Sequence, residues 1–245
     1  MSPEGAPRSP QRMRREQEAL AVWGVTHLPR APQAQARAVS DKEEAMAQIE
    51  REIVACRRCS LYQTRTKHVP GEGDLHARLV FIGEAPGRDE DLQGRPFIGR
   101  AGQLLTKMIE AMGLRREDVY ICNVLKDRPP NNRTPEPEEM IACLPFLERQ
   151  LDLIQPRVMC ALGSIALKAL LGPHMFISTA RGHVHDYRGI PLVPTFHPAY
   201  LLRNPPAKKL AWADLKLIKR MLEEDKDVGD EGRRGGGAVA GPAAS

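Results

Sequence analysis

The organisation of this chain is decided by the stretch Gly83-Glu84-Ala85-Pro86-Gly87 and by the apolar run Arg78-Leu-Val-Phe-Ile82 that precedes it. A short run rich in Val, Ile and Phe predicts a buried strand. The Gly-x-x-Pro-Gly after it ends the strand abruptly and lets backbone N–H groups approach a ligand. Ligands of open α/β sheets bind at the carboxyl ends of strands, which favours a site here, although an ordinary strand-to-loop turn carries the same motif.

Composition and charge narrow the class of protein. The 245 residues are 42% hydrophobic and carry a formal net charge of +5, which fits one globular domain with tails and a polyanionic partner. No apolar run approaches the ~18 residues of a membrane span. The N-terminal region has no apolar signal stretch, so we expect a cytoplasmic protein that does not bind a membrane. The five cysteines are unevenly placed, which indicates metal ligands or buried thiols in a reducing compartment.

Predicted strands and helices alternate along the middle of the chain. The strands are expected at residues 79–82, 118–124, 158–162 and 192–196. Helices are expected from the capping box of Ser40 and Glu43 to Cys56, from Ser164, and over residues 101–112, 137–154 and 208–222. This alternation predicts an α/β fold, a three-layer α/β/α sandwich around a central four-stranded, mostly parallel sheet.

Two tails flank the predicted domain. Residues 1–39 are rich in Pro, Ala, Gln and Arg and contain one aromatic residue, Trp23, so we expect a disordered basic tail. Residues 224–245 are charged and then rich in Gly and Ala, and we expect them to be disordered as well. The folded domain is therefore predicted over residues 40–223.

Polar and aromatic side chains follow three of the predicted strands. Glu84 and Phe97 come after the first strand, Asn123 ends the second, and His197 follows the fourth. A flat aromatic ring, a carboxamide and an imidazole together suit a flat heterocycle with amide-like edges. Each residue alone has a simpler explanation: Phe97 in the core, Asn123 bonded to loop backbone, and His197 capping a turn.

With these motifs in order, the chain resembles the type-4 uracil-DNA glycosylases of the uracil-DNA glycosylase superfamily. The stretches that carry the resemblance are Gly83–Gly87, Gly94–Leu105, Asn123–Lys126, Arg128–Arg133 and His197–Arg203. They fall within residues 56–222, so the resemblance leaves both tails out. It implies that residues 40–223 are a uracil-DNA glycosylase domain.

The resemblance implies an enzyme of base excision repair. Such a hydrolase flips uracil out of DNA and cleaves its N-glycosidic bond, leaving an abasic site. We expect a monomer whose partner is uracil-containing DNA. The alternative is a non-catalytic, cluster-containing nucleic-acid-binding module of the same fold. A third possibility, a relative that becomes covalently linked to abasic DNA through a His-bearing basic insert, is disfavoured because residues 129–132 contain no histidine.

The resemblance also assigns roles to single residues around uracil. The uracil-binding group would be Glu84, Ala85, Phe97, Asn123 and His197. Phe97 would stack on uracil, and Asn123 would read its amide edge. His197 would donate to the oxygen that gains negative charge, a kind of contact worth ~3 kcal/mol.

The catalytic residues would be His197 and Glu84. Related families place an Asp where this chain has Ala85, so Glu84 is the nearest carboxylate for the attacking water. Asp89, Glu90 and Asp91 are the alternatives along the same loop.

DNA contacts are expected from the last motif and the Pro-rich loop. Leu201 or Leu202 would wedge into the gap left by the flipped base, and Arg203 would hold a phosphate. A basic rim around the pocket would combine Arg203 with Arg128, Arg133 and Lys126.

Type-4 enzymes carry a [4Fe-4S] cluster on four cysteines, and this chain departs from that pattern at one position. Cys56, Cys59 and Cys143 match three ligands, but Asp127 stands in the place of the fourth. Carboxylate binds iron more weakly than thiolate, and zinc held by three Cys and one Asp is the alternative. The remaining cysteines, Cys122 and Cys160, are expected to be buried core thiols.

Overall fold

The computed structural model describes residues 32–234. Its contacts divide the chain into two units, residues 1–41 and 42–245. Residues 1–31, with Trp23, and residues 235–245 lie outside the described part, and the expectations for the tails fall largely on them. Within the described part, no helix is both long and apolar enough to cross a membrane.

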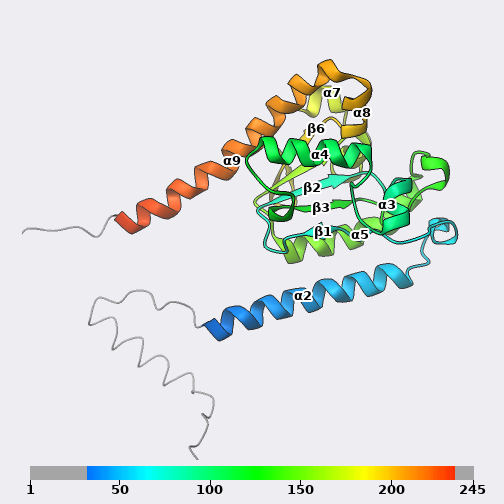
Figure 1. Ribbon diagram of the computed structural model, residues 1–245, viewed down its shortest axis with the longest axis horizontal. Helices are drawn as coiled ribbons and strands as arrows, with labels where there is room; N and C mark the ends of the chain where they lie inside the picture. The colour runs from blue at the N-terminus through cyan, green and yellow to red at the C-terminus, as the bar shows by residue number, and fades with distance from the viewer. Residues whose placement is uncertain (1–31, 235–245) are drawn as a thin grey trace, which may run out of the picture. The chain divides into compact units, whose positions relative to one another are not determined.

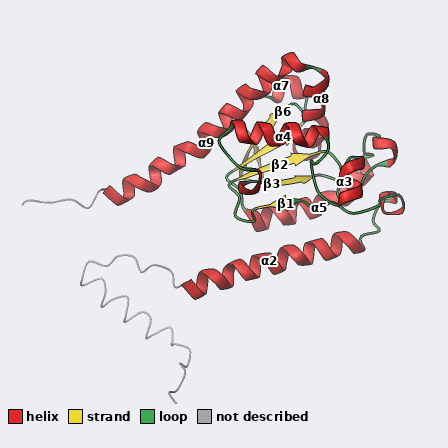
Figure 2. Cartoon of the chain, viewed as in Figure 1, coloured by secondary structure: helices red, strands yellow, loops and turns green. Residues whose placement is uncertain are grey.

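Strands and helices alternate along the second unit (Figure 2). The strands are β1 (Glu72–Gly73), β2 (Leu79–Gly83), β3 (Tyr120–Asn123), β4 (Val158–Leu162), β5 (His185–Tyr187) and β6 (Ile190–Thr195). The α-helices are α2 (Pro32–Ala55), α3 (Arg88–Gln93), α4 (Arg100–Ala111), α5 (Pro137–Ile154), α6 (Ser164–Leu171), α7 (Ile177–Ala180), α8 (Pro198–Arg203) and α9 (Lys208–Arg234). Short 3-10 helices are η1 (Ser60–Gln63), η2 (Arg116–Asp118), η3 (Pro130–Asn132) and η4 (Pro205–Ala207).

The six strands form one sheet in the order β1-β3-β2-β4-β6-β5. The four inner strands are parallel, and they are the four predicted from the sequence. The two outer strands, β1 and β5, pair antiparallel and were not predicted. β1 has only two residues, and β5 is the polar sequence His-Asp-Tyr. The expectation of four strands is therefore corrected to six.

Helices cover both faces of the sheet, as predicted for a three-layer sandwich (Figure 1). Along β2, Val80 and Ile82 pack against residues of α2, α5 and α6, while Leu79 and Phe81 pack against α4, α8 and α9. Every residue of β2 is buried, which explains its continuous apolar sequence.

Helix boundaries follow the sequence closely in the middle of the chain and less closely at its ends. The predicted helices at 101–112 and 137–154 are confirmed as α4 and α5. The first helix begins at Pro32 rather than Ser40, because residues 33–38 are mostly Ala, Gln and Arg, which are strong helix formers. The last helix passes the predicted end at Leu222 and continues to Arg234 through charged residues.

The connections that leave the carboxyl ends of β2 and β4 go to opposite faces of the sheet. β2 leads to α4 on one face, and β4 leads to α6 on the other. Since β2 and β4 are neighbours, their connections separate and leave a crevice between them. The motif Gly83–Gly87 lies at this crevice.

Candidate active site

A cavity of about 470 Å³ opens at the carboxyl ends of the parallel strands, and we call it the base pocket. Its lining includes all five residues predicted to bind uracil, namely Glu84, Ala85, Phe97, Asn123 and His197. Arg203 and Arg133 line it too. Sheet register brings these residues together, because Gly83 of β2 pairs with Asn123 of β3 and Leu162 of β4 pairs with Thr195 of β6.

Phe97 stands in the base pocket in an unusual backbone conformation. Its φ is 50°, in the left-handed region, which an aromatic residue rarely occupies. Holding such a conformation costs on the order of 1–3 kcal/mol, so the surrounding structure must impose it. The ring is buried, and its centroid lies 5.7 Å from that of His197 with a tilt of 36°.

Asn123 places an unpaired acceptor in the same pocket. Its side chain is 1% exposed, and among the described residues its Oδ1 has no hydrogen-bond partner. A buried acceptor without a partner is costly, so this oxygen suits a ligand that brings an N–H donor.

Gly83 leaves the space that the side chains of Asn123 and Phe97 occupy. A Cβ at this position would come within 2.4 Å of both Asn123 Oδ1 and Phe97 Cζ.

His197 is held as a neutral imidazole. Its Nδ1 accepts a hydrogen bond from the backbone N–H of Ala199 at 3.1 Å, so the ring proton resides on Nε2. Burial, and then the positive charge of Arg203, lowers the pKa of His197 to about 4. The imidazole therefore offers a neutral N–H donor to the pocket throughout the physiological pH range.

Gly163, at the end of β4, supports His197 and was not predicted from the sequence. Its φ is +91°, and a Cβ there would lie 2.9 Å from His197 Cβ. In the sequence, this position is marked only by the Gly-Ser pair after β4, a pattern that also occurs at an ordinary helix start.

The structure distinguishes the four carboxylates that the sequence left as candidates for positioning the attacking water. Glu84 lines the pocket, and burial raises its pKa. Asp91 Oδ1 accepts from the backbone N–H of Thr66 at 2.8 Å, so its side chain serves the fold. Glu90 also lines the pocket, but its Oε1 is already engaged, accepting from the N–H groups of Ile98 and Gly99, both at 3.0 Å. Asp89 is exposed and is not part of the pocket lining.

The residues expected to contact DNA divide between surface and core. Leu202 and Arg203 are exposed on α8, whereas Leu201 is 1% exposed and packs in the core. Leu201 therefore has no free surface with which to wedge into DNA. α8 is amphipathic, and the sequence alone did not distinguish the two leucines.

The expected basic rim loses one of its four members. Lys126 is 1% exposed, and its Nζ donates to Asn123 O at 2.8 Å and to Gln150 Oε1 at 2.7 Å. It is a buried support of β3, and the prediction that it lies on the rim was wrong. Arg133 lines the pocket but also pairs with Glu139 at 2.6 Å, while Arg128 donates to Asn132 at 2.7 Å.

We call Cys56, Cys59, Cys143 and Asp127 together the cysteine site. Cys143 Sγ accepts from the backbone N–H of Lys126 at 3.2 Å, and burial raises the pKa of Cys143 to about 11. Burial raises the pKa of Cys59 as well, with smaller contributions from Asp127 and Cys56. Within residues 32–234, no three His, Cys, Asp or Glu side chains converge closely enough to hold a metal ion.

Asp127 is anchored through one carboxylate oxygen. Its Oδ2 pairs with Arg65 Nη1 at 2.7 Å, and each side chain is 11% exposed. Its Oδ1 is buried and, among the described residues, has no hydrogen-bond partner. Asp127 therefore keeps one carboxylate oxygen whose lone pairs no described residue engages.

The other two cysteines are buried, as predicted. Cys122 packs on one face of the sheet and Cys160 on the other.

Comparison with known proteins places the chain in a family. The model of the Uracil DNA glycosylase superfamily matches residues 70–216. A type-4 uracil-DNA glycosylase of Thermotoga maritima is 46% identical over 188 residues, covering 75% of this chain and 98% of the relative. Those of Archaeoglobus fulgidus and Saccharolobus solfataricus are 46% and 41% identical over 183 and 202 residues, covering 71% and 75% of this chain and 92% and 93% of the relatives. With this match and these identities, the chain belongs to the type-4 family of the uracil-DNA glycosylase superfamily.

Proposed function

We propose that this protein hydrolyses the N-glycosidic bond of uracil in DNA and releases the free base, leaving an abasic site for base excision repair. The observation that carries the proposal is the unpaired, buried Oδ1 of Asn123 beside the ring of Phe97. Uracil has a flat face on which the Phe97 ring can stack and a ring N–H that can donate to Asn123 Oδ1. A cavity of about 470 Å³ suits a base that has been flipped out of the duplex.

In this proposal, Phe97 stacks on the flipped base and Asn123 accepts from its ring N–H. The Nε2–H of His197 donates to the uracil oxygen that becomes negative as the bond to the sugar breaks. The pKa of about 4 keeps the imidazole neutral, and the N–H of a neutral imidazole is too weak an acid to pass its proton to the anion that it stabilises. This contact gains strength as the charge develops, so it acts mainly in the transition state.

Glu84 is proposed to position the attacking water, with the backbone of Ala85 beside it in the pocket lining. As the C1′–N1 bond breaks, its electron pair leaves with uracil. The water oxygen bonds to C1′, and the proton of the water passes to the carboxylate of Glu84. The raised pKa of Glu84, caused by burial, brings it closer to the range where a carboxylate accepts a proton readily.

Contact with DNA is assigned to the exposed side of α8 and to the loop around η3. Arg203 is proposed to hold a phosphate, and Leu202 is proposed to fill the gap left by the base. Arg128 and Arg133 complete the basic rim. We further propose a monomeric enzyme in the cytoplasm, which fits five cysteines that are all free. Residues 40–223 are proposed as the catalytic domain.

For the cysteine site we propose a [4Fe-4S] cluster held by the three thiols and Asp127 Oδ1. The buried, unpaired oxygen and the electrostatic coupling among Cys59, Cys143 and Asp127 support this donor set. Among the described residues, these side chains do not themselves converge on a metal position. When bound, the cluster would join the end of α2, the start of α5 and the loop between β3 and η3 as a structural cross-link.

The test is excision from a single-uracil oligonucleotide, followed by alkali cleavage and a denaturing gel. We expect strand cleavage for uracil and none for a matched thymine oligonucleotide. His197→Ala should slow single-turnover excision by ~100-fold or more with nearly unchanged affinity for uracil DNA.

Two outcomes would count against the proposal. Absence of cleavage by the wild-type protein, with DNA binding retained, would favour the non-catalytic nucleic-acid-binding module. Equal losses of binding and rate in His197→Ala would make His197 a structural residue.

A further inference from the structure

The loop that carries Phe97 needs support from outside the base pocket. Phe97 has a φ of 50°, and its backbone passes so close to α4 that a Cβ on Gly102 would lie 1.8 Å from Phe97 O. A short loop in a left-handed conformation returns to a more relaxed one unless other groups hold it.

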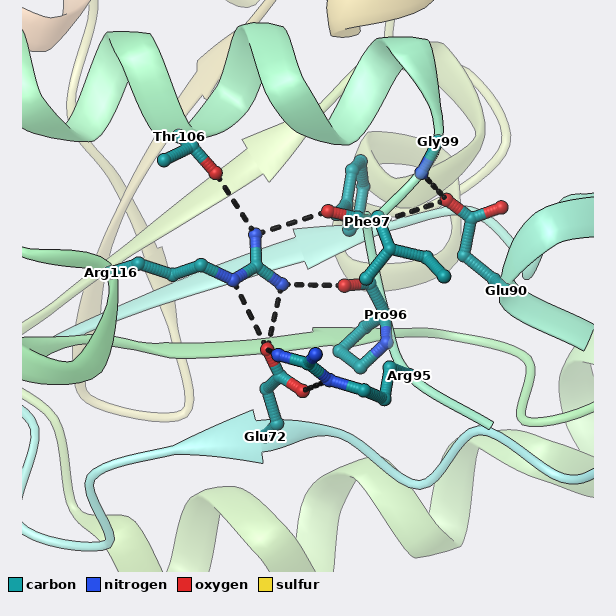
Figure 3. A network of polar contacts seen from close by, with 9 residues as sticks. Glu72, Glu90, Arg95, Pro96, Phe97, Gly99, Thr106 and Arg116 are labelled. Carbon is teal, nitrogen blue, oxygen red and sulfur yellow. Dashed lines mark hydrogen bonds and ion pairs between the residues drawn. The ribbon is translucent and has the colours of Figure 1, made fainter. Parts of the chain in front are cut away.

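Arg116, at the start of η2, holds the carbonyl groups of this loop (Figure 3). Its Nη2 donates to Pro96 O at 2.6 Å, and its Nη1 donates to Phe97 O at 3.1 Å. The same Nη1 donates to Thr106 Oγ1 of α4 at 3.3 Å. A planar guanidinium reaches several acceptors at fixed angles, which an ammonium group cannot do.

Glu72 of β1 holds Arg116 from the other side. Glu72 Oε1 accepts from Arg116 Nε at 3.1 Å and from Nη2 at 2.9 Å. Glu72 is itself paired with Arg95 at 2.7 Å (Figure 3). The side chain of Arg116 is 18% exposed, so these charge-assisted bonds are only partly screened by water.

The N–H groups of the loop are held by a different side chain. Glu90 of α3 accepts from Ile98 and Gly99, immediately after Phe97. Arg116 thus fixes the carbonyl groups before and at Phe97, and Glu90 fixes the amides after it. Between the two, the backbone around Phe97 has little freedom.

We propose that Arg116 is a positioning residue for base recognition: it imposes the conformation in which the Phe97 ring faces the flipped base. The inference rests on the proposed stacking role of Phe97. Arg116 is not part of the pocket lining, so it acts only through the loop. The expected consequence is that Arg116 changes recognition of uracil and leaves affinity for undamaged DNA unchanged.

The main variant is Arg116→Lys, which keeps a positive charge opposite Glu72 but loses the fork of donors. The matched control is Arg115→Lys on the neighbouring residue, whose side chain is 72% exposed and pairs with Asp118. We expect Arg116→Lys to slow single-turnover excision by about 10- to 100-fold, and the control by less than about twofold. Binding to a 2′-fluoro-2′-deoxyuridine oligonucleotide should weaken, while binding to a matched thymine oligonucleotide should not.

A double-mutant cycle separates this role from general destabilisation. In a Phe97→Ala background, Arg116→Lys should cost less than about twofold, because the ring that Arg116 positions is gone. Multiplicative losses in the double variant would overturn the proposal, as would wild-type excision by Arg116→Lys. If Phe97→Ala itself excises uracil at the wild-type rate, the assignment of Phe97 fails and this inference fails with it.

A second variant covers the case in which Arg116→Lys does not fold. Glu72→Gln keeps the guanidinium and removes the charge that anchors it, so we expect a loss of the same kind but only about threefold. A thermal melt of each variant shows whether the protein is still folded at the assay temperature. A folded Glu72→Gln protein whose binding weakens equally for the 2′-fluoro-2′-deoxyuridine and thymine oligonucleotides would contradict a role specific to the base.

Discussion

The base pocket and the cysteine site differ in how their polar atoms are held. In the base pocket, Asn123 and the motif around Gly83 are fixed by sheet register, and His197 is fixed by a bond to the backbone next to it. In the cysteine site, Cys59 and Asp127 lie in loops, and no group within the described part of the chain is spaced for a metal. Parallel strands therefore assemble the base pocket directly, whereas the side chains of the cysteine site are carried by loops and helix ends that no sheet register aligns.

Gly83→Ala is the sharpest way to break the base pocket. The new Cβ would overlap Asn123 Oδ1 and Phe97 Cζ, each at 2.4 Å, so one of these groups must move. We expect single-turnover excision to fall by about 100-fold.

Gly113→Ala is the control without steric overlap, since nothing lies within 4 Å of the added Cβ, although its φ of +80°, unlike that of Gly83, strains any side chain. It should lower the melting temperature and leave excision near wild type. Equal loss of excision in both variants would mean that the overlap with Asn123 and Phe97 is not what disables Gly83→Ala.

The cysteine site is tested by restoring a thiol at its unusual position. Oxygen holds iron less tightly than thiolate, so an iron ligated by Asp127 should be the first to leave in air. Asp127→Cys should slow conversion to a three-iron cluster by about tenfold. Electron paramagnetic resonance of air-exposed protein measures this conversion. Loss of one iron should weaken folding and DNA binding more than chemistry in the base pocket. Identical decay in wild type and variant, or no iron in either, would leave Asp127 as the partner of Arg65 alone.

The two regions also show how far sequence reasoning extends. The apolar runs predicted β2, β3, β4 and β6, and the polar residues after them were brought into one cavity. Local patterns failed where a distant partner decides the environment. Lys126 reads as a surface lysine, yet Gln150, 24 residues away, provides its buried acceptor. Arg116 reads as one charge in a polar turn, yet its acceptors lie on the Phe97 loop.

Glu84→Gln is a smaller test, and its effect depends on pH. Burial raises the pKa of Glu84 above 4.5 in the folded protein, so ionising this carboxyl costs stability. Below pH 4.5 the wild type and the variant should be equally stable. As the pH rises through the raised pKa, the wild type should lose stability relative to Glu84→Gln, and thermal melts at several pH values would measure this.

Wild-type excision should decline as the pH falls through the pKa of Glu84, since His197, with a pKa of about 4, stays neutral there. The exposed Glu110→Gln on α4 is the control for removing a carboxylate outside the pocket. If Glu84→Gln melts at the same temperature as the wild type at every pH, the carboxylate of Glu84 is exposed to solvent and not buried.

Arg203→Ala should have the smallest effect. Affinity for DNA should fall with salt, and loss of one phosphate contact should flatten the slope of log K against log[salt] by about one. Lys126 is buried and should not contribute to this slope. An unchanged slope in Arg203→Ala, measured by fluorescence anisotropy, would remove Arg203 from the DNA contact.

The burial of Lys126 has a consequence for chemical labelling. Its amine is sealed from water between Asn123 and Gln150, and its backbone N–H is bonded to Cys143. Reagents that acylate amines will modify exposed lysines such as Lys107 and Lys208 and leave Lys126 intact while this packing holds. The mass of the peptide that contains Lys126 therefore reports on both regions at once. A label on Lys126 marks molecules in which the packing between Asn123, Gln150 and Cys143 has opened.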